Sequence, residues 1–116
     1  MGSLDMLRSR LDFAALQTDA RSRVDPLIVL RYRRNGLDRT RYGISTGRRV
    51  GSAVVRNTIR RRLRRLLAGL VERVADGWDI MIIARPPAAT ASQAQLGEVL
   101  ERLLRQAGLL RSEPAA

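Results

Sequence analysis

The chain has 116 residues, 45% of them hydrophobic, and carries a formal net charge of +11. This length suits one domain with one modest core, and this hydrophobic content argues against wholesale disorder. Cysteine and histidine are absent from the sequence, which excludes a disulfide scaffold, zinc knuckles and thiol catalysis and fits a reducing compartment. No apolar run approaches the roughly 20 residues of a membrane span. We therefore expect one cytoplasmic domain over residues 1–116, with an ordered core at about 7–108.

The first half of the chain predicts one short helix and two strands. The helix falls within residues 4–17, where Ser9 is a candidate N-cap. Residues 27–34 and 41–47 read as strands, and Asn35-Gly36 between them is a strong turn signal. We expect these two strands to pair as an antiparallel hairpin.

The second half predicts a helix, a strand and a helix. The first of these helices begins near Ser52 and runs to about residue 75. Residues 78–85 form a nearly continuous apolar run, typical of a central strand that is covered on both faces. A capping box at Ser92 opens the last helix, which Gly108 closes. The order is α-β-β-α-β-α, and the middle helix is expected to cross over between two parallel strands, right-handed by general statistics.

The positive charge is concentrated in one segment. Residues 31–65 contain thirteen arginines and a single acid, Asp38, while the rest of the chain sums to −1. All 22 basic residues are arginine, and guanidinium groups bind phosphates bidentately and stack on bases. A basic patch of this kind suits a polyanion.

The arginines of the middle helix fall on one side of it. A helical projection places Val55, Ile59, Leu63, Leu66 and Leu70 on a buried stripe. The other side carries Asn57, Arg60, Arg61, Arg64 and Arg65, with Arg56 and Arg62 at the flanks.

Three interpretations of this charged side compete. A solvated face normally mixes charges of both signs, whereas Arg60–Arg64 and Arg61–Arg65 are like-charge pairs that cost a few tenths of a kcal/mol each. An amphipathic helix on an anionic membrane is a second option, but its apolar side lacks aromatic residues and is needed by the sheet. Binding of nucleic acid phosphates explains the pattern best, and Asn57 can then contact a 2′-hydroxyl or a base edge.

The stretch "GRRVGSAVVRNTIRRRLRRLL" (47–67) resembles the signature of the bacterial ribonuclease P protein family. The similarity extends to "RSRLDFAAL", "PLIVLRYR" and "GWDIMIIARPPAA", and covers roughly residues 7–108. Two positions depart from the family pattern: Thr58 stands where the motif commonly has Arg, and Gln17 where a second aromatic is frequent.

The resemblance implies an α/β (α+β) two-layer sandwich whose mixed sheet has a left-handed β-α-β crossover, in place of the right-handed one. It also implies that the protein binds a large catalytic RNA and assists removal of the 5′ leader from precursor tRNA. The residues expected to meet the RNA subunit are Arg48, Arg49, Arg56, Asn57, Arg60, Arg61, Arg64 and Arg65.

A cleft between the N-terminal helix and the sheet is implied as the site of the single-stranded leader. Our candidates there are Phe13 to stack a base, Val29 as the floor, Arg31 for a phosphate and Ser45 for a sugar or phosphate. Core packing is the alternative for Phe13, and solvent exposure is the alternative for Arg31.

The side-chain composition agrees with a protein that binds RNA and leaves the hydrolysis to the RNA. A protein nuclease site needs histidines or paired carboxylates, and neither accompanies the basic segment. We therefore expect no catalytic residue and no metal held by the protein, with Mg²⁺ held by the RNA subunit and the substrate. We also expect a protein that is monomeric when alone and binds no membrane. A general RNA-binding or ribosomal protein without a role in cleavage is the alternative.

Overall fold

The computed structural model describes residues 4–111, apart from the side chain of Arg10. Within this range the chain forms one mixed sheet of four strands together with three α-helices. The elements are α1 (Arg10–Thr18), β1 (Arg21–Val24), β2 (Ile28–Arg34), β3 (Arg41–Thr46), α2 (Ala53–Leu70), β4 (Trp78–Ala84) and α3 (Gln93–Gln106). Short 3₁₀ turns occupy Arg48–Val50, Val71–Arg73 and Pro86–Thr90. The expected α+β class is confirmed.

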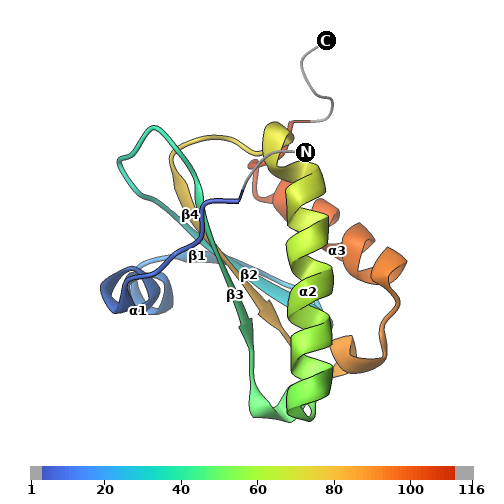
Figure 1. Cartoon of the computed structure of the whole chain (residues 1–116). Helices are drawn as coiled ribbons and strands as arrows, with labels where there is room; N and C mark the ends of the chain where they lie inside the picture. Colours follow the sequence, from blue (N-terminus) through green and yellow to red (C-terminus); the bar gives the residue numbers. More distant parts are fainter. Residues whose placement is uncertain (1–3, 112–116) are drawn as a thin grey trace.

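The strands lie in the order β1-β2-β4-β3 (Figure 1). β1 pairs with β2 and β2 with β4 in antiparallel fashion, whereas β3 and β4 are parallel and are connected through α2. The expected parallel pair is therefore confirmed, and β4 is the covered central strand that its apolar run predicts. The expected hairpin between the second and third strands is wrong, because β4 lies between them.

The side chain of Asn35 explains why its turn signal makes no hairpin. Its amide donates to the carbonyl oxygen of Arg39 and to Oδ1 of Asp79 on β4, both at 3.0 Å. Its backbone N–H donates to the carbonyl of Gly77, just before β4. Asn35 thus connects the end of β2 to β4 and leaves room for that strand to enter the sheet.

The strand β1 is an addition to the expected element order. It has four residues, Arg-Ser-Arg-Val, and all four are exposed. A short edge strand of this kind has no apolar alternation from which it could be predicted. At the other edge, residues 5–7 cover β3, since Leu7 N–H donates to Tyr42 O and Tyr42 N–H donates to Asp5 O.

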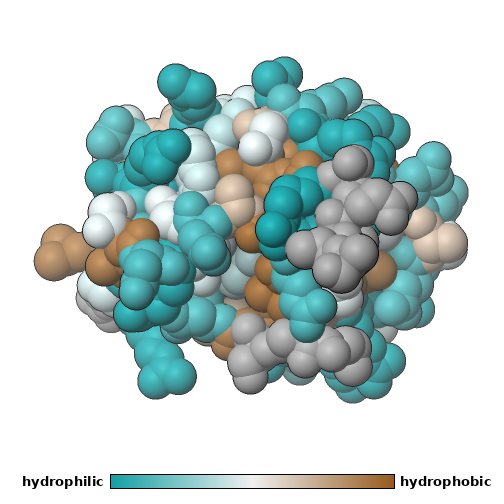
Figure 2. Space-filling model, turned by 90° about the horizontal axis from the view of Figure 1, so that it is seen from above, coloured by the Kyte–Doolittle hydropathy of each residue, from teal (hydrophilic) through white to brown (hydrophobic). Residues whose placement is uncertain are grey.

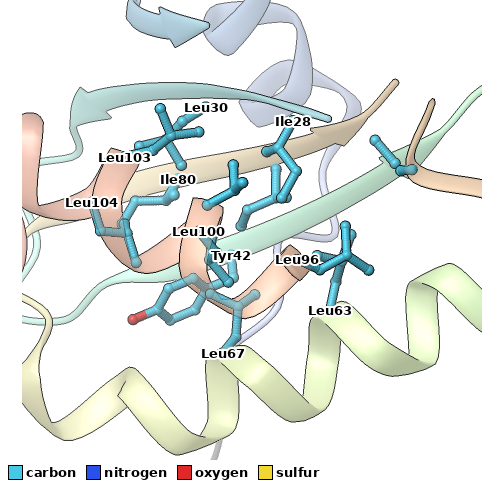
Figure 3. Close-up of a cluster of buried hydrophobic side chains, with 14 of the residues drawn as sticks. Ile28, Leu30, Tyr42, Leu63, Leu67, Ile80, Leu96, Leu100, Leu103 and Leu104 are labelled. Atoms are coloured by element: carbon cyan, nitrogen blue, oxygen red, sulfur yellow. The ribbon is translucent and has the colours of Figure 1, made fainter. Parts of the chain in front are cut away.

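The main core lies between the sheet and the pair α2 and α3. Leucines of both helices meet alternate residues of β2 and β4 there, and Tyr42 of β3 reaches into the same layer (Figure 3). Helix α2 contributes Ile59, Leu63 and Leu67 as its buried residues, whereas Leu66 is half-buried. The buried stripe is thus turned slightly from the one predicted, which omitted Leu67.

Helix α1 packs on the opposite face of the sheet (Figure 1). A small second cluster of Leu7, Leu16 and Met81 anchors it, with Phe13 packed against them. Seen from above, hydrophilic residues surround an apolar area near the middle of the molecule (Figure 2). Among the described residues, no helix has the length and apolar character needed to cross a lipid bilayer.

Candidate nucleic-acid interface

Helix α2 starts at a well-formed cap that follows the tight Gly47–Gly51 segment. The Ser52 hydroxyl accepts a hydrogen bond from the N–H of Val55. Ile59 and Leu63 are then completely buried against the sheet. Because these residues fix the rotation of the helix, Arg60 and Arg61 between them point to solvent, whereas Arg62 is half-buried and donates to the carbonyl oxygen of Ala91.

The outward side of α2 is an arginine face, defined here as Asn57, Arg60, Arg61, Arg64 and Arg65. All five residues are exposed. Throughout residues 4–111, no carboxylate oxygen lies within 4.0 Å of a guanidinium nitrogen of these arginines. The positive charge is therefore not neutralised by the fold itself, and it faces the solvent where a polyanion can reach it.

The remaining residues predicted for this interface lie around the arginine face. Arg48 and Arg49 are exposed on the 3₁₀ turn that precedes α2. Arg56 is half-buried at the flank, and its Nε is buried without a hydrogen-bond partner among the described residues. The structure thus brings seven of the eight predicted residues to the surface and places Arg56 at the boundary of the core.

A hollow of about 240 Å³ lies at the base of the arginine face. Its polar lining comes from Asn57, Arg60, Arg61 and Arg64, and its apolar lining from Met6 and Ile44. The Arg60 guanidinium donates to Oδ1 of Asn57 at 3.0 Å, which holds the two side chains together. Met6 and Ile44 are the residues that the sequence did not predict here, since they come from outside the basic segment.

Thr58 departs from the family motif and does not belong to the arginine face. Its hydroxyl donates to the carbonyl oxygen of Val54 at 2.9 Å, and the residue is half-buried. Its polar group is thus used by its own helix. The four arginines of the arginine face all follow Thr58 along the helix.

The register of the sheet brings two of its three predicted leader residues, Val29 and Ser45, into one row. Val29 on β2 and Ser45 on β3 are both paired with Ile83 of β4. Directly paired residues share a face of a sheet, so all three are on the face that carries α1. Val29 and Ile83 are half-buried and Ser45 is exposed. Ile83 was missed by the sequence analysis, although the alternation of Asp79, Met81 and Ile83 along β4 would have indicated it.

Phe13 and Arg31 occupy the neighbouring row, under and beside α1. Arg31 is paired with Met81, which is paired with Gly43, and the Phe13 ring lies against both Gly43 and Met81. Nε of Arg31 donates to the carbonyl oxygen of Leu16, and its terminal nitrogen donates to that of Gln17 at 3.0 Å. Arg31 therefore binds the last turn of α1, where carbonyl groups lack partners within the helix. Gln17 itself is exposed.

A second arginine fixes the other end of α1. Arg41 donates to both carboxylate oxygens of Asp79, at 2.9 and 2.8 Å, and to both of Asp12, at 3.2 and 3.3 Å. The hydrogen bond to Asp79 raises the pKa of the Arg41 guanidinium, against the opposing effect of burial. Helix α1 is thus held on two adjacent rows of the sheet. Asp12 forms an ion pair with Arg41, and the Phe13 ring packs on the row of Gly43 and Met81.

The described residues offer no cluster of three or more histidine, cysteine, aspartate or glutamate side chains that could hold a metal ion. The chemistry available at the interface is that of guanidinium groups, one carboxamide and one hydroxyl. These groups bind and orient phosphates, sugars and bases.

An arginine face without carboxylates, on a helix packed against a mixed sheet, defines a basic α+β protein built to bind a polyanion. The chain belongs to the ribonuclease P protein family, whose model matches residues 1–108. Members of this family are protein subunits of a ribonucleoprotein endoribonuclease that acts in tRNA 5′ maturation.

Individual relatives agree with this assignment. The ribonuclease P protein component of Symbiobacterium thermophilum is 37% identical over 108 residues, covering 92% of this chain and 94% of the relative. That of Roseiflexus castenholzii is 36% identical over 106 residues, covering 90% and 87%. The solved RNase P protein of Staphylococcus aureus is 27% identical with a TM-score of 0.85, covering 94% of this chain and all of that one. The protein from Thermotoga maritima is 28% identical with a TM-score of 0.78, covering 87% and 96%.

Proposed function

We propose that the arginine face of α2, with Arg48, Arg49 and Arg56, binds the catalytic RNA subunit of ribonuclease P. The observation that carries this proposal is the absence of any neutralising carboxylate around the arginine face within residues 4–111. Like-charge pairs at i,i+4 destabilise the isolated helix, and phosphates placed between them relieve that repulsion. Bidentate guanidinium–phosphate contacts then fix the register of the RNA on the helix.

The 5′ leader of precursor tRNA is proposed to lie on the α1 face of the sheet. The row Val29–Ile83–Ser45 offers an apolar floor that ends in a hydroxyl. Phe13 flanks this row from α1 and can stack a base. Arg31 supports the site by holding the last turn of α1, since two of its nitrogens already donate to carbonyl groups there.

Hydrolysis is assigned to the RNA and to Mg²⁺ that the RNA and the substrate hold. Bound there, Mg²⁺ would supply activation of the attacking water and stabilisation of the leaving oxygen. The side chains of this protein act before that step, because they reduce repulsion between two RNA molecules and orient the substrate. We further propose that the protein alone is a cytoplasmic monomer.

Addition of the purified protein to the RNA subunit tests this function. We expect faster cleavage of precursor tRNA at low magnesium concentration, because the arginines replace part of the counterion requirement. RNA binding without any stimulation, across titrations of both salt and magnesium, would favour a general RNA-binding protein instead.

The leader site is tested with Phe13→Leu, which keeps apolar packing and removes the aromatic ring. The expected result is a dissociation constant raised at least about fivefold for precursor tRNA with a long leader, since a stacked base contributes about 1–3 kcal/mol. Mature tRNA without a leader is the matched control. An equal loss of affinity for both RNAs would contradict the assignment of this face.

A further inference from the structure

A second basic hollow lies at the end of the sheet where β2 stops and β4 begins. It has a volume of about 800 Å³, and its charged and aromatic lining comes from Asp19, Arg21, Tyr32, Arg33, Arg34 and Trp78. It shares no lining residue with the hollow beside α2. Arg21 belongs to β1, which forms the edge of the sheet opposite to β3. This hollow is therefore separate from the arginine face.

An arginine lies over a tryptophan ring in its wall. Arg34 and Trp78 are directly paired across β2 and β4, and Cζ of Arg34 lies 5.0 Å from the centroid of the Trp78 ring. The Tyr32 ring packs against Trp78 with a centroid distance of 5.9 Å and an angle of 59° between the planes. Trp78 is thus fixed between its neighbours. Arg34 is exposed, so a ligand in the hollow can reach its guanidinium.

The charge of this hollow is only partly compensated. Asp19 approaches Arg33 at 3.7 Å, but the Asp19 side chain is 84% exposed, so this pair is loose and solvent-screened. Across residues 4–111, Arg21 and Arg34 have no carboxylate oxygen within 4.0 Å. Three guanidinium groups around one cavity repel each other in the free protein, and an anion in the cavity would relieve this repulsion.

We propose that this hollow binds one nucleotide of single-stranded RNA. Guanidinium groups of the lining contact the phosphate, and the base stacks on the outer plane of Arg34, which Trp78 supports from below. Arginine planes and aromatic rings are the usual platforms for unpaired bases. An acidic peptide could satisfy the charges but would make no use of the Arg34–Trp78 cation–π pair. This site adds to the interface proposed above and does not depend on it.

Trp78 makes the proposal directly measurable, because it is the single tryptophan of the chain. A pentauridylate oligonucleotide is titrated into the full-length protein at low salt, and Trp78 emission is recorded. We expect a saturable change of emission. Arg21→Ala with Arg34→Ala should weaken by at least about tenfold the binding that Trp78 emission reports, while the anisotropy of a labelled copy of the oligonucleotide follows total binding.

Two variants distinguish binding of the oligonucleotide in this hollow from its nonspecific attraction to the positive charge of the protein. Arg102→Ala with Arg105→Ala removes two charges from α3, outside the hollow, and should leave the affinity within about twofold. Arg34→Lys keeps the charge but removes the plane, so it should fall between wild type and Arg34→Ala. Thermal unfolding confirms that each variant is folded. The proposal is overturned by binding without a change of Trp78 emission, or by equal losses in the two double variants.

The source of the nucleotide follows from the assembled holoenzyme. A change of Trp78 emission on addition of the RNA subunit alone assigns the nucleotide to that RNA. A change that appears only with precursor tRNA carrying a long leader assigns it to the substrate. Either result supports the site. Unchanged emission in a holoenzyme that cleaves its substrate would rule out occupation of the hollow during the reaction.

Discussion

The ring of Phe13 lies so close to Gly43 that any larger side chain at position 43 would have to displace its neighbours between α1 and β3. A Cβ atom placed on Gly43 would lie 3.0 Å from Cε1 of Phe13 and 3.0 Å from Sδ of Met81. Real Cβ contacts are rarely this short. The glycine at position 43 is therefore required by the approach of the helix and not by its backbone conformation, since its φ is not positive.

We predict that Gly43→Ala destabilises the protein by about 1–3 kcal/mol, the usual cost of overpacking. Met81 can move, but the Phe13 ring is connected to a helix that Arg31 and Arg41 hold in place. Denaturant unfolding measures the change. Gly47→Ala is the matched control, because nothing lies within 4 Å of its added Cβ and its φ of −75° suits alanine. Equal stability of the two variants would show that α1 is free to shift.

Arg41→Ala should be more damaging than the loss of a surface arginine. Asp79 is 3% exposed, and without Arg41 its carboxylate keeps a side-chain hydrogen bond from the Asn35 amide alone within residues 4–111. Removal of one partner of a buried pair costs about 3 kcal/mol or more. Arg105→Ala breaks an exposed pair with Glu101 and should cost less than about 1 kcal/mol. The free energy of unfolding of both variants checks this difference.

The sequence predicts the local elements of this protein well and its strand pairing poorly. Ser52 and Ser92 open α2 and α3 as caps, and the spacing of Ile59 and Leu63 correctly separates the core side of α2 from the arginine face. These features depend on residues three to four positions apart. The insertion of β4 between β2 and β3 depends on contacts such as Asn35 with Asp79, which are 44 positions apart, and no local pattern encodes them.

In the candidate sites too, the sequence predicts the features that depend on nearby residues and misses those that depend on distant contacts. The residues of the arginine face follow from one helical projection, whereas Ile83, Met6 and Ile44 join their sites only through the fold. Arg31 shows both what the sequence predicts and what it does not. Alternation correctly places it on the face of Val29, but only the packing of α1 shows that its guanidinium donates to carbonyl groups of that helix.

Tyr42 should make the stability of the protein fall at alkaline pH. Its hydroxyl is buried without a hydrogen-bond partner among the described residues. Burial, with a smaller contribution from Asp76, raises its pKa above the usual value of about 10. Below pH 10 the phenol is neutral in both states, so no pH dependence arises. Above pH 10 the unfolded chain releases the proton while the folded chain retains it, so stability falls as pH rises.

Comparison with Tyr42→Phe isolates this effect. At pH 7 the variant should be as stable as wild type or more stable by about 1 kcal/mol, because a buried unpaired hydroxyl is removed. Between pH 10 and 11 its advantage should grow by up to about 1.4 kcal/mol per pH unit. Denaturant unfolding at both pH values measures the difference. A constant difference would show that the phenol ionises equally in the folded and unfolded states.

Arg60→Ala with Arg64→Ala should separate RNA binding from folding. Both side chains are exposed and form one like-charge i,i+4 pair, so their loss should change stability by no more than about 0.5 kcal/mol. Affinity for the RNA subunit should fall, and the slope of log affinity against log salt should decrease by about 1 for each arginine that contacts a phosphate. Arg102→Ala with Arg105→Ala removes the same charge from α3, where each arginine faces a carboxylate. If this control reduces the salt slope equally, the overall charge of the protein governs binding, and the arginine face has no special role.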